Sequence, residues 1–247
     1  MSDWNPGQYL KFESERNKAI LDLLGRVGLP CPARAIDIGC GPGNSTEFLC
    51  RRWPGAEIIG LDSSKAMLEA AAKRLPGLQW IECDAAGNLS RLGKFDLVFS
   101  NAALQWMPDH ERVVPAWFAM LKPGGVLAVQ VPHNHESPLH LALLAYTESE
   151  PQVYRPAGYY YDILSRLTGN FEIWAIDYHH VLDSHEDMIE WYKGTAFRPH
   201  LARLNVQGQE KFLADMLSRA RELYPLQADG KILFAFKRLF FVANKEI

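Results

Sequence analysis

The stretch DIGCGPGNS, from Asp37 to Ser45, places Gly39, Gly41 and Gly43 at alternate positions directly after a short apolar run. Glycines with this spacing permit a tight strand-to-helix turn and let a ligand approach the backbone closely. Asn44 stands where a dinucleotide-binding loop has its last glycine, and no Gly-Lys-Ser/Thr follows to pair with a phosphate. The stretch therefore indicates either a nucleoside ligand without phosphate chemistry or only a tight turn.

Five strands that alternate with helices are predicted around this loop, at 33–38, 56–62, 78–84, 95–101 and 126–131. Such alternation is typical of a parallel sheet, whose ligands bind at the carboxyl ends of the strands. The residues at four of these ends are Asp37, Asp62, Asp84 and Asn101. We expect these polar side chains to face one site.

The second half of the chain predicts a sixth strand at 171–182 and a last strand at 231–244, separated by a helical block at about 184–229. That block is too long for a plain crossover, and we interpret it as a cap over the strand ends. We expect a single domain over 1–247, with an N-terminal helical lid (1–29), a cofactor-binding half (30–132) and a substrate half (133–247).

Composition excludes several classes of partner. The chain has 247 residues, 48% of them hydrophobic, and a formal net charge of −3 without a long Lys/Arg run, which argues against nucleic acid. No apolar run approaches the roughly 20 residues of a membrane helix. The four cysteines form no C-x-x-C pair, which favours free thiols in the cytoplasm. His133 and His135 lack a second cluster at ligand spacing, so no metal is predicted.

Two acidic residues, Asp62 and Asp84, narrow the class of ligand that the site can bind. Asp62 lies nineteen residues after Gly43, at the end of the next strand, where a carboxylate can accept both ribose hydroxyls or cap a helix. Asp84 can accept from an exocyclic amine of a base, or serve as a turn residue.

Together, D-x-G-x-G-x-G, the acids that end the second and third strands, and LKPGG before the fifth strand resemble the class I S-adenosylmethionine-dependent methyltransferases. The resemblance implies a Rossmann-like α/β fold with a seven-stranded, mostly parallel sheet whose last strand is antiparallel between the fifth and sixth. It also implies S-adenosyl-L-methionine as the cofactor, which carries a carboxylate and a sulfonium instead of phosphates.

The same resemblance assigns roles to individual positions around the cofactor. Gly39, Gly41 and Gly43 would line its methionine part, Asp37 would support the loop, Asp62 would hold the ribose with Ser63 and Met67 beside the adenine, Asp84 and Ala85 would lie at the adenine edge, and Asn101 and Ala102 near the sulfonium. Trp106 is read as a lid over the cofactor or as a core aromatic.

Within this superfamily, WNPGQYLKF, CGPGNST, QWMPDH, YYDIL, FRPHL and FKRLFFVA are similar to the trans-aconitate 2-methyltransferase family, from Trp4 almost to the last residue. That similarity implies esterification of a small polycarboxylate, trans-aconitate. His133 and His200 depart from the family pattern, which has an acid and a tryptophan there. Two alternatives stay open: methylation of another carboxylate, such as a malonyl thioester, and cofactor binding without turnover.

A trianionic acceptor requires fixed positive charge and hydrogen-bond donors in its pocket. Arg198 lies in the predicted cap, and Arg238 interrupts an apolar strand, where a charge is costly unless it faces solvent or a ligand. The other candidates for the pocket and its lid are Tyr160, Tyr161, His133, Trp4, Tyr9 and Arg16. The alternatives are surface arginines and core aromatics.

The chemistry predicts no catalytic residue in the strict sense. A carboxyl group with a pKa near ~4 is already ionised at pH 7 and needs no general base. Rate acceleration would come from aligning oxygen, methyl and sulfur in a site that excludes water.

Overall fold

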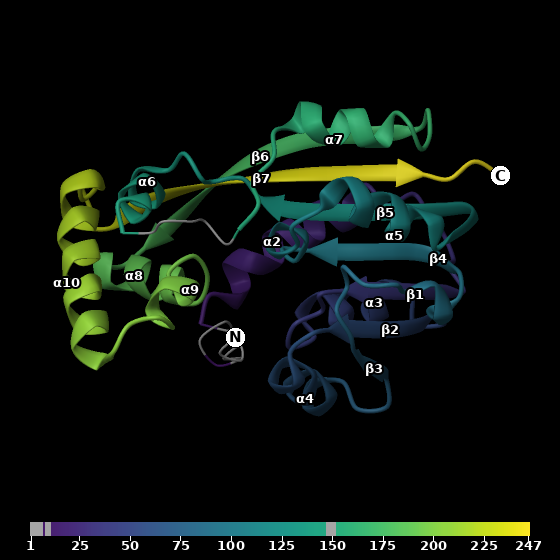
Figure 1. Cartoon of the computed structure of the whole chain (residues 1–247), viewed down its shortest axis with the longest axis horizontal. Helices are drawn as coiled ribbons and strands as arrows, with labels where there is room; N and C mark the ends of the chain where they lie inside the picture. Colours follow the sequence, from purple (N-terminus) through teal and green to yellow (C-terminus); the bar gives the residue numbers. More distant parts are fainter. Residues whose placement is uncertain (1–6, 8–10, 147–151) are drawn as a thin grey trace.

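A computed structural model describes residue 7 and residues 11–146 and 152–247, so Trp4 and Tyr9 lie outside the described part of the chain. Its centre is a seven-stranded sheet in the order β3-β2-β1-β4-β5-β7-β6. β7 is antiparallel to both of its neighbours, β5 and β6, whereas the remaining pairs are parallel (Figure 1). The α/β fold expected from the sequence, including the reversed last strand, is confirmed.

The strands are β1 (Arg34–Ile38), β2 (Glu57–Asp62), β3 (Gln79–Glu82), β4 (Phe95–Asn101), β5 (Leu121–Pro132), β6 (Phe171–Leu182) and β7 (Ile232–Asn244). The helices of the first half are α2 (Glu13–Gly25), α3 (Asn44–Arg52), α4 (Lys65–Arg74) and α5 (His110–Ala119), with short 3-10 turns η1 (Ser90–Leu92) and η2 (Leu104–Trp106). Those of the second half are α6 (Pro138–Leu144), α7 (Ala157–Leu164), α8 (His185–Lys193), α9 (Arg198–Leu201) and α10 (Val206–Leu223).

Apolar residues on both sides of the central strands require helices on both faces of the sheet. On one face, α2 and α3 bury Ile20, Leu23 and Leu49 against the sheet. On the other, α5 and α7 bury Trp117 and Tyr160. The sheet is therefore the middle of three layers, with helices on both faces. Because the helices cover the two faces, the polar ends of the strands are where a ligand can bind.

A two-stranded ribbon carries the helices of the second half. β6 and β7 pair from Phe171–Ala243 to Leu182–Ile232, whereas β5 stops opposite Arg238. Residues 232–237 of β7 therefore extend past the rest of the sheet. α6, α8 and α10 pack on this extension around Phe234, and Figure 1 shows them beside the far end of β6 and β7.

Several boundaries differ from those expected. β3 ends at Glu82, so Asp84 follows the strand by two residues. The KPGG segment does not separate α5 from β5 but lies inside β5, where the register against β4 shifts between Phe95 and Leu97. The block at 184–229 consists of three helices with turns between them. Among the described residues, no helix is both long and apolar enough to cross a bilayer.

Candidate active site

The glycine loop after β1 is held in a left-handed backbone conformation. Gly39, Gly41 and Gly43 have φ values of +71°, +54° and +90°. A Cβ atom at Gly39 would lie 2.2 Å from the Cβ of Ala103, so this glycine is needed for close packing. A Cβ at Gly41 would meet no atom within 4 Å, so the backbone there is bare on an open side. This open side fits a ligand that approaches the main chain.

Asp62 ties the loop to the next strand and helix. Its carboxylate accepts hydrogen bonds from the backbone N–H groups of Gly41 and Ser64, each at 2.9 Å. Ser64, rather than its neighbour Ser63, caps α4 by accepting from Met67 N–H at 3.3 Å. Ser63 is exposed and Met67 is buried. Asp62 therefore fixes the position of Gly41, the residue with the open backbone.

Asp37 is fully buried beneath the same loop. Its Oδ2 atom accepts from Ser45 Oγ at 2.7 Å and from Thr46 Oγ1 at 2.6 Å, which joins β1 to the first turn of α3. Burial raises the pKa of Asp37 to about 6; the two hydroxyl donors oppose this rise, and the charge of Asp62 adds to it. The sequence expectation that Asp37 supports the loop agrees with these contacts.

Asp84 and Ala85 lie in the turn after β3. Asp84 is exposed and accepts from Ala86 N–H at 2.9 Å, while the Ala85 carbonyl accepts from the Trp117 indole N–H at 3.0 Å. The turn function weighed for Asp84 is thus observed, and its place at an adenine edge stays a prediction.

The chain turns sharply where β4 ends. Ala102 has φ +56°, a conformation that costs a non-glycine residue roughly 1–2 kcal/mol. Its N–H donates to Gln130 O at 2.9 Å, and its carbonyl accepts from Gln105 Nε2 at 2.7 Å. The side-chain oxygens of Asn101 and Gln105 are buried and accept no hydrogen bond within the described part of the chain. Two acceptor oxygens are therefore available at this edge of the sheet.

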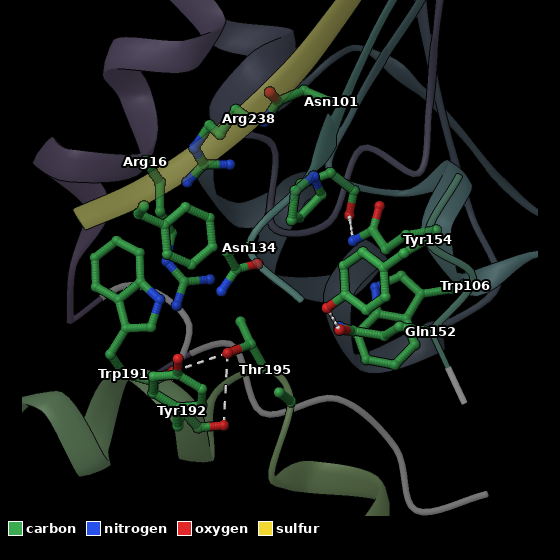
Figure 2. Close-up of a pocket in the computed structure, with 15 residues that line it drawn as sticks. Arg16, Asn101, Trp106, Asn134, Gln152, Tyr154, Trp191, Tyr192, Thr195 and Arg238 are labelled. Atoms are coloured by element: carbon green, nitrogen blue, oxygen red, sulfur yellow. Dashed lines mark hydrogen bonds between the residues drawn. The ribbon is translucent and has the colours of Figure 1, made fainter. Parts of the chain in front are cut away.

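A cavity lies between the strand ends and the helices of the second half. Figure 2 shows the fifteen residues that line it. They are Arg16, Asn101, Ala102, Gln105, Trp106, Pro132, Asn134, Gln152, Tyr154, Trp191, Tyr192, Thr195, Ala196, Phe236 and Arg238.

Two arginines are the charged members of this lining, and both are buried. Arg238 Nη1 donates to Gln130 Oε1 at 3.4 Å, and its guanidinium carbon lies 4.7 Å from the Phe236 ring centre. The Arg16 guanidinium lies 5.1 Å from the Trp191 ring centre. Behind this wall, burial and then the charge of Arg238 lower the pKa of His180 to about 4. One wall of the cavity is therefore cationic.

The structure brings some predicted acceptor residues to the cavity and leaves others outside it. Arg16 and Arg238 line it, as does Trp106. Arg198 is absent from the lining, and its guanidinium lies over the ring of Trp106 at 5.5 Å from the ring centre. His133 donates its backbone N–H to Lys237 O at 2.8 Å, and its ring packs edge-on against His135 at 4.9 Å, next to the lining rather than in it.

Tyr160 and Tyr161 need correction. Tyr160 is fully buried in the core, where its hydroxyl lies 3.0 Å from His110 Nδ1 and its ring packs on Phe241. Tyr161 is 56% exposed on α7 and meets Phe171 edge-on. Because α7 covers the face of the sheet, and not the strand ends, neither side chain lines this cavity.

Several lining residues were missed by sequence reasoning. They are Gln105, Pro132, Asn134, Gln152, Tyr154, Trp191, Tyr192, Thr195, Ala196 and Phe236. Most come from loops and from α8, whose adjacent Trp191 and Tyr192 look like ordinary core residues. Their one distinguishing signal, an open position beside two arginines, exists only after folding. No cluster of three metal-ligating side chains occurs in the described ranges.

A family model described as a methyltransferase domain matches residues 35–125. Proteins named trans-aconitate 2-methyltransferase are similar over the full length: one from Rhodopseudomonas palustris (strain BisB18) is 44% identical over 257 residues, covering 99% of this chain and 100% of that protein. Another, from Variovorax paradoxus (strain S110), is 41% identical over 258 residues, covering 100% of both.

A solved structure, the YcgJ protein from Bacillus subtilis, superposes with a TM-score of 0.64 at 17% identity, covering 94% of this chain and 99% of that one. At this identity the likeness establishes the fold alone. The full-length relatives establish more, because their similarity includes α8 and β7, which line the cavity, as well as the glycine loop. The chain therefore belongs to the trans-aconitate 2-methyltransferase family.

Proposed function

We propose that this protein transfers a methyl group from S-adenosyl-L-methionine to a carboxylate oxygen of trans-aconitate, giving a monomethyl ester and S-adenosylhomocysteine. The observation that carries the proposal is the pair of buried arginines, Arg16 and Arg238, in the cavity that adjoins Asn101 at the end of β4. Guanidinium groups bind carboxylates through charge-assisted, bidentate hydrogen bonds, so two of them at one cavity fit a polycarboxylate.

The residues present fit the cofactor. The open backbone at Gly41 would admit its amino-acid part, and Asp62, which accepts from Gly41 N–H, would hold its ribose. Asn101 has an unsatisfied oxygen at the cavity. Ser63, Met67, Asp84 and Ala85 follow β2 and β3, where the adenine would lie. When bound, S-adenosyl-L-methionine supplies an electrophilic methyl group on a positively charged sulfur.

The cavity has two chemically different walls, which supports a reaction between a cation and an anion. Oxygen acceptors of Asn101 and Gln105 lie on the β4–η2 side and suit positive charge. Arg16 and Arg238, on α2 and β7, suit negative charge. The two walls favour an orientation in which a carboxylate oxygen faces the methyl donor.

The chain's own residues would position and desolvate rather than transfer protons. The acceptor is ionised at neutral pH, so a general base is not required. A carboxylate held by a guanidinium is a weaker nucleophile than a free one, so Arg16 and Arg238 would bind the spectator carboxylates. The remaining carboxylate would then react by proximity and alignment.

We infer that the chain divides into the predicted parts: a lid (1–29), a cofactor-binding half (30–132) and a substrate half (133–247). Phe12 and Arg16 support the lid, since both pack on Trp191 of α8. We also infer a cytoplasmic enzyme, supported by four free cysteines.

The test is methyl transfer from labelled S-adenosyl-L-methionine to trans-aconitate, cis-aconitate, citrate, isocitrate and a malonyl thioester, with the ester identified by mass spectrometry. Preferential esterification of trans-aconitate is expected. Esterification of the thioester alone would move the protein to the carrier-bound acids. Binding of cofactor without any ester would identify a module that does not turn over.

A further inference from the structure

A buried indole N–H at the cavity lacks an acceptor. Trp191, on α8, is 1% exposed and lines the cavity, and no described group accepts a hydrogen bond from its Nε1 atom. Two other buried indoles are satisfied, since Trp53 donates to Leu29 O at 3.2 Å and Trp117 to Ala85 O at 3.0 Å. The Nε1 atom of Trp80 also lacks an acceptor among the described residues, but Trp80 does not line the cavity. More than nine in ten buried polar groups in native proteins have a partner. An unsatisfied donor at a binding cavity therefore points to a ligand acceptor.

The packing around Trp191 fixes the direction of this donor. The ring is held by Phe12 at 5.1 Å, His180 at 5.0 Å and Phe236 at 5.4 Å, from α2, β6 and β7. Figure 2 shows the indole nitrogen on the edge of the ring that faces Arg16 and Asn134. A rotation that would satisfy the N–H elsewhere is opposed on three sides, so the donor is pre-oriented.

Arg16 and Arg238 define two separate anion positions. The Arg16 guanidinium stacks on Trp191, while that of Arg238 stacks on Phe236 and is tied to Gln130. The indole N–H belongs with Arg16, so one anion position offers a charge and a directional neutral donor together. Such a pair recognises an oxygen anion by geometry as well as by charge.

Resting on the proposed function, we propose that Trp191 is a specificity-determining residue: its Nε1–H donates a hydrogen bond to one carboxylate of the acceptor, in a subsite shared with Arg16, while Arg238 binds a second carboxylate. The indole thereby distinguishes acids that carry this carboxylate from acids that lack it. An acid that lacks it cannot accept this hydrogen bond and leaves the buried N–H unsatisfied.

The test uses Trp191→Phe, which keeps a smaller aromatic ring for Phe12 and Arg16 and removes the donor. Trp174→Phe is the matched control, because Trp174 also stacks on a phenylalanine, Phe240 at 5.2 Å, and also carries an arginine over its ring, yet lies on β6 away from the cavity. Melting temperatures of both variants report on folding.

Affinities are measured by calorimetry on protein saturated with S-adenosylhomocysteine, for trans-aconitate and for mesaconate, cis-glutaconate and itaconate. Each of these dicarboxylates lacks a different one of the three carboxylates. Trp191→Phe should weaken the binding of trans-aconitate and of two dicarboxylates about tenfold, as expected for the loss of a hydrogen bond to a charged group. The affinity for the third dicarboxylate, which lacks the carboxylate that Trp191 binds, should stay within twofold. Trp174→Phe should leave all four within twofold.

If Trp191→Phe weakens the binding of all four acids equally, or weakens the binding of none, the proposed subsite is refuted. The proposed function is judged separately, by ester formation with the wild-type protein. Binding that follows the expected pattern without ester formation supports the subsite and refutes the activity. Failure of the wild-type protein to bind any of the four acids refutes both.

Discussion

Arg16 and Arg238 enter one cavity from near opposite ends of the chain, on α2 and on β7, and each guanidinium lies over an aromatic ring (Figure 2).

Arg238→Ala should raise the acceptor KM more than tenfold, because removal of one partner of a buried charge pair costs about 2–5 kcal/mol. The cofactor Kd should change less than twofold. Initial rates at varied acceptor, with Arg219→Ala on the exposed side of α10 as control, measure both effects. If Arg238→Ala leaves the acceptor KM unchanged, Arg238 does not bind the acceptor.

Arg198→Ala should have a smaller effect than Arg238→Ala. Its guanidinium lies over the ring of Trp106, and a cation–π contact at a partly exposed site is worth about 0.5–1 kcal/mol. The acceptor KM should therefore rise only about two- to fivefold. A loss as large as that of Arg238→Ala would mean that Arg198 reaches the acceptor directly.

Two glycines of the loop should separate folding from cofactor binding. Gly39→Ala places a Cβ 2.2 Å from Ala103 and should lower the free energy of unfolding by several kcal/mol (~3). Gly41→Ala meets no atom and should cost only about 1 kcal/mol of left-handed strain, yet weaken cofactor binding at least tenfold. Urea unfolding and calorimetry with S-adenosylhomocysteine test the pair. Equal affinity of Gly41→Ala and wild type would contradict the assigned approach.

Asp37 should make the protein less stable as pH rises. Its native pKa of about 6 lies above the ordinary 3.8, so the native state binds more protons than the unfolded chain between these values. The free energy of unfolding therefore falls across that window, by about 3 kcal/mol in total from this residue. Asp37→Asn can still accept from Ser45 and Thr46, and it should remove this component. Urea unfolding at pH 4.5 and pH 7 measures the difference.

The control for Asp37 is Asp177→Asn, at an exposed position of β6. It should keep the wild-type dependence of unfolding on pH. If Asp37→Asn and wild type lose the same free energy between the two pH values, Asp37 is not the buried acid described.

Tyr160→Phe should affect stability and not the acceptor. It removes the contact with His110 Nδ1 at 3.0 Å, and a lost buried hydrogen bond costs about 1 kcal/mol or slightly more. The acceptor KM should stay within twofold, and Tyr161→Phe should alter neither quantity. Thermal denaturation and initial rates test this. If Tyr160→Phe raises the acceptor KM and leaves the stability unchanged, Tyr160 contacts the acceptor after all.

The cofactor side of the fold was predictable because its signals are local. The alternation of strands and helices and the three glycines at fixed spacing specify a turn whose positive φ values only glycine adopts without strain. The order of the last two strands came from resemblance, since no local pattern says that β7 lies between β5 and β6.

The acceptor side was harder to predict because residues distant in the chain form it. Arg238 could be suspected, since an arginine in an apolar strand is unusual. Trp191 could not, because it looks like core until the missing partner of its N–H is seen. Tyr160 and Tyr161 were misplaced because an aromatic run does not reveal which side of α7 faces the sheet.

Because β6 and β7 extend beyond β5, helices α6, α8 and α10 rest on this ribbon rather than on the strands that hold the glycine loop. We therefore expect that these helices can be exchanged for others that admit a different acid while methyl donation continues. A graft of residues 133–237 alone would still meet Arg16 of the recipient. Chimeras between relatives should therefore inherit a shared carboxylate anchor from the N-terminal helix and their selectivity from the transplanted segment.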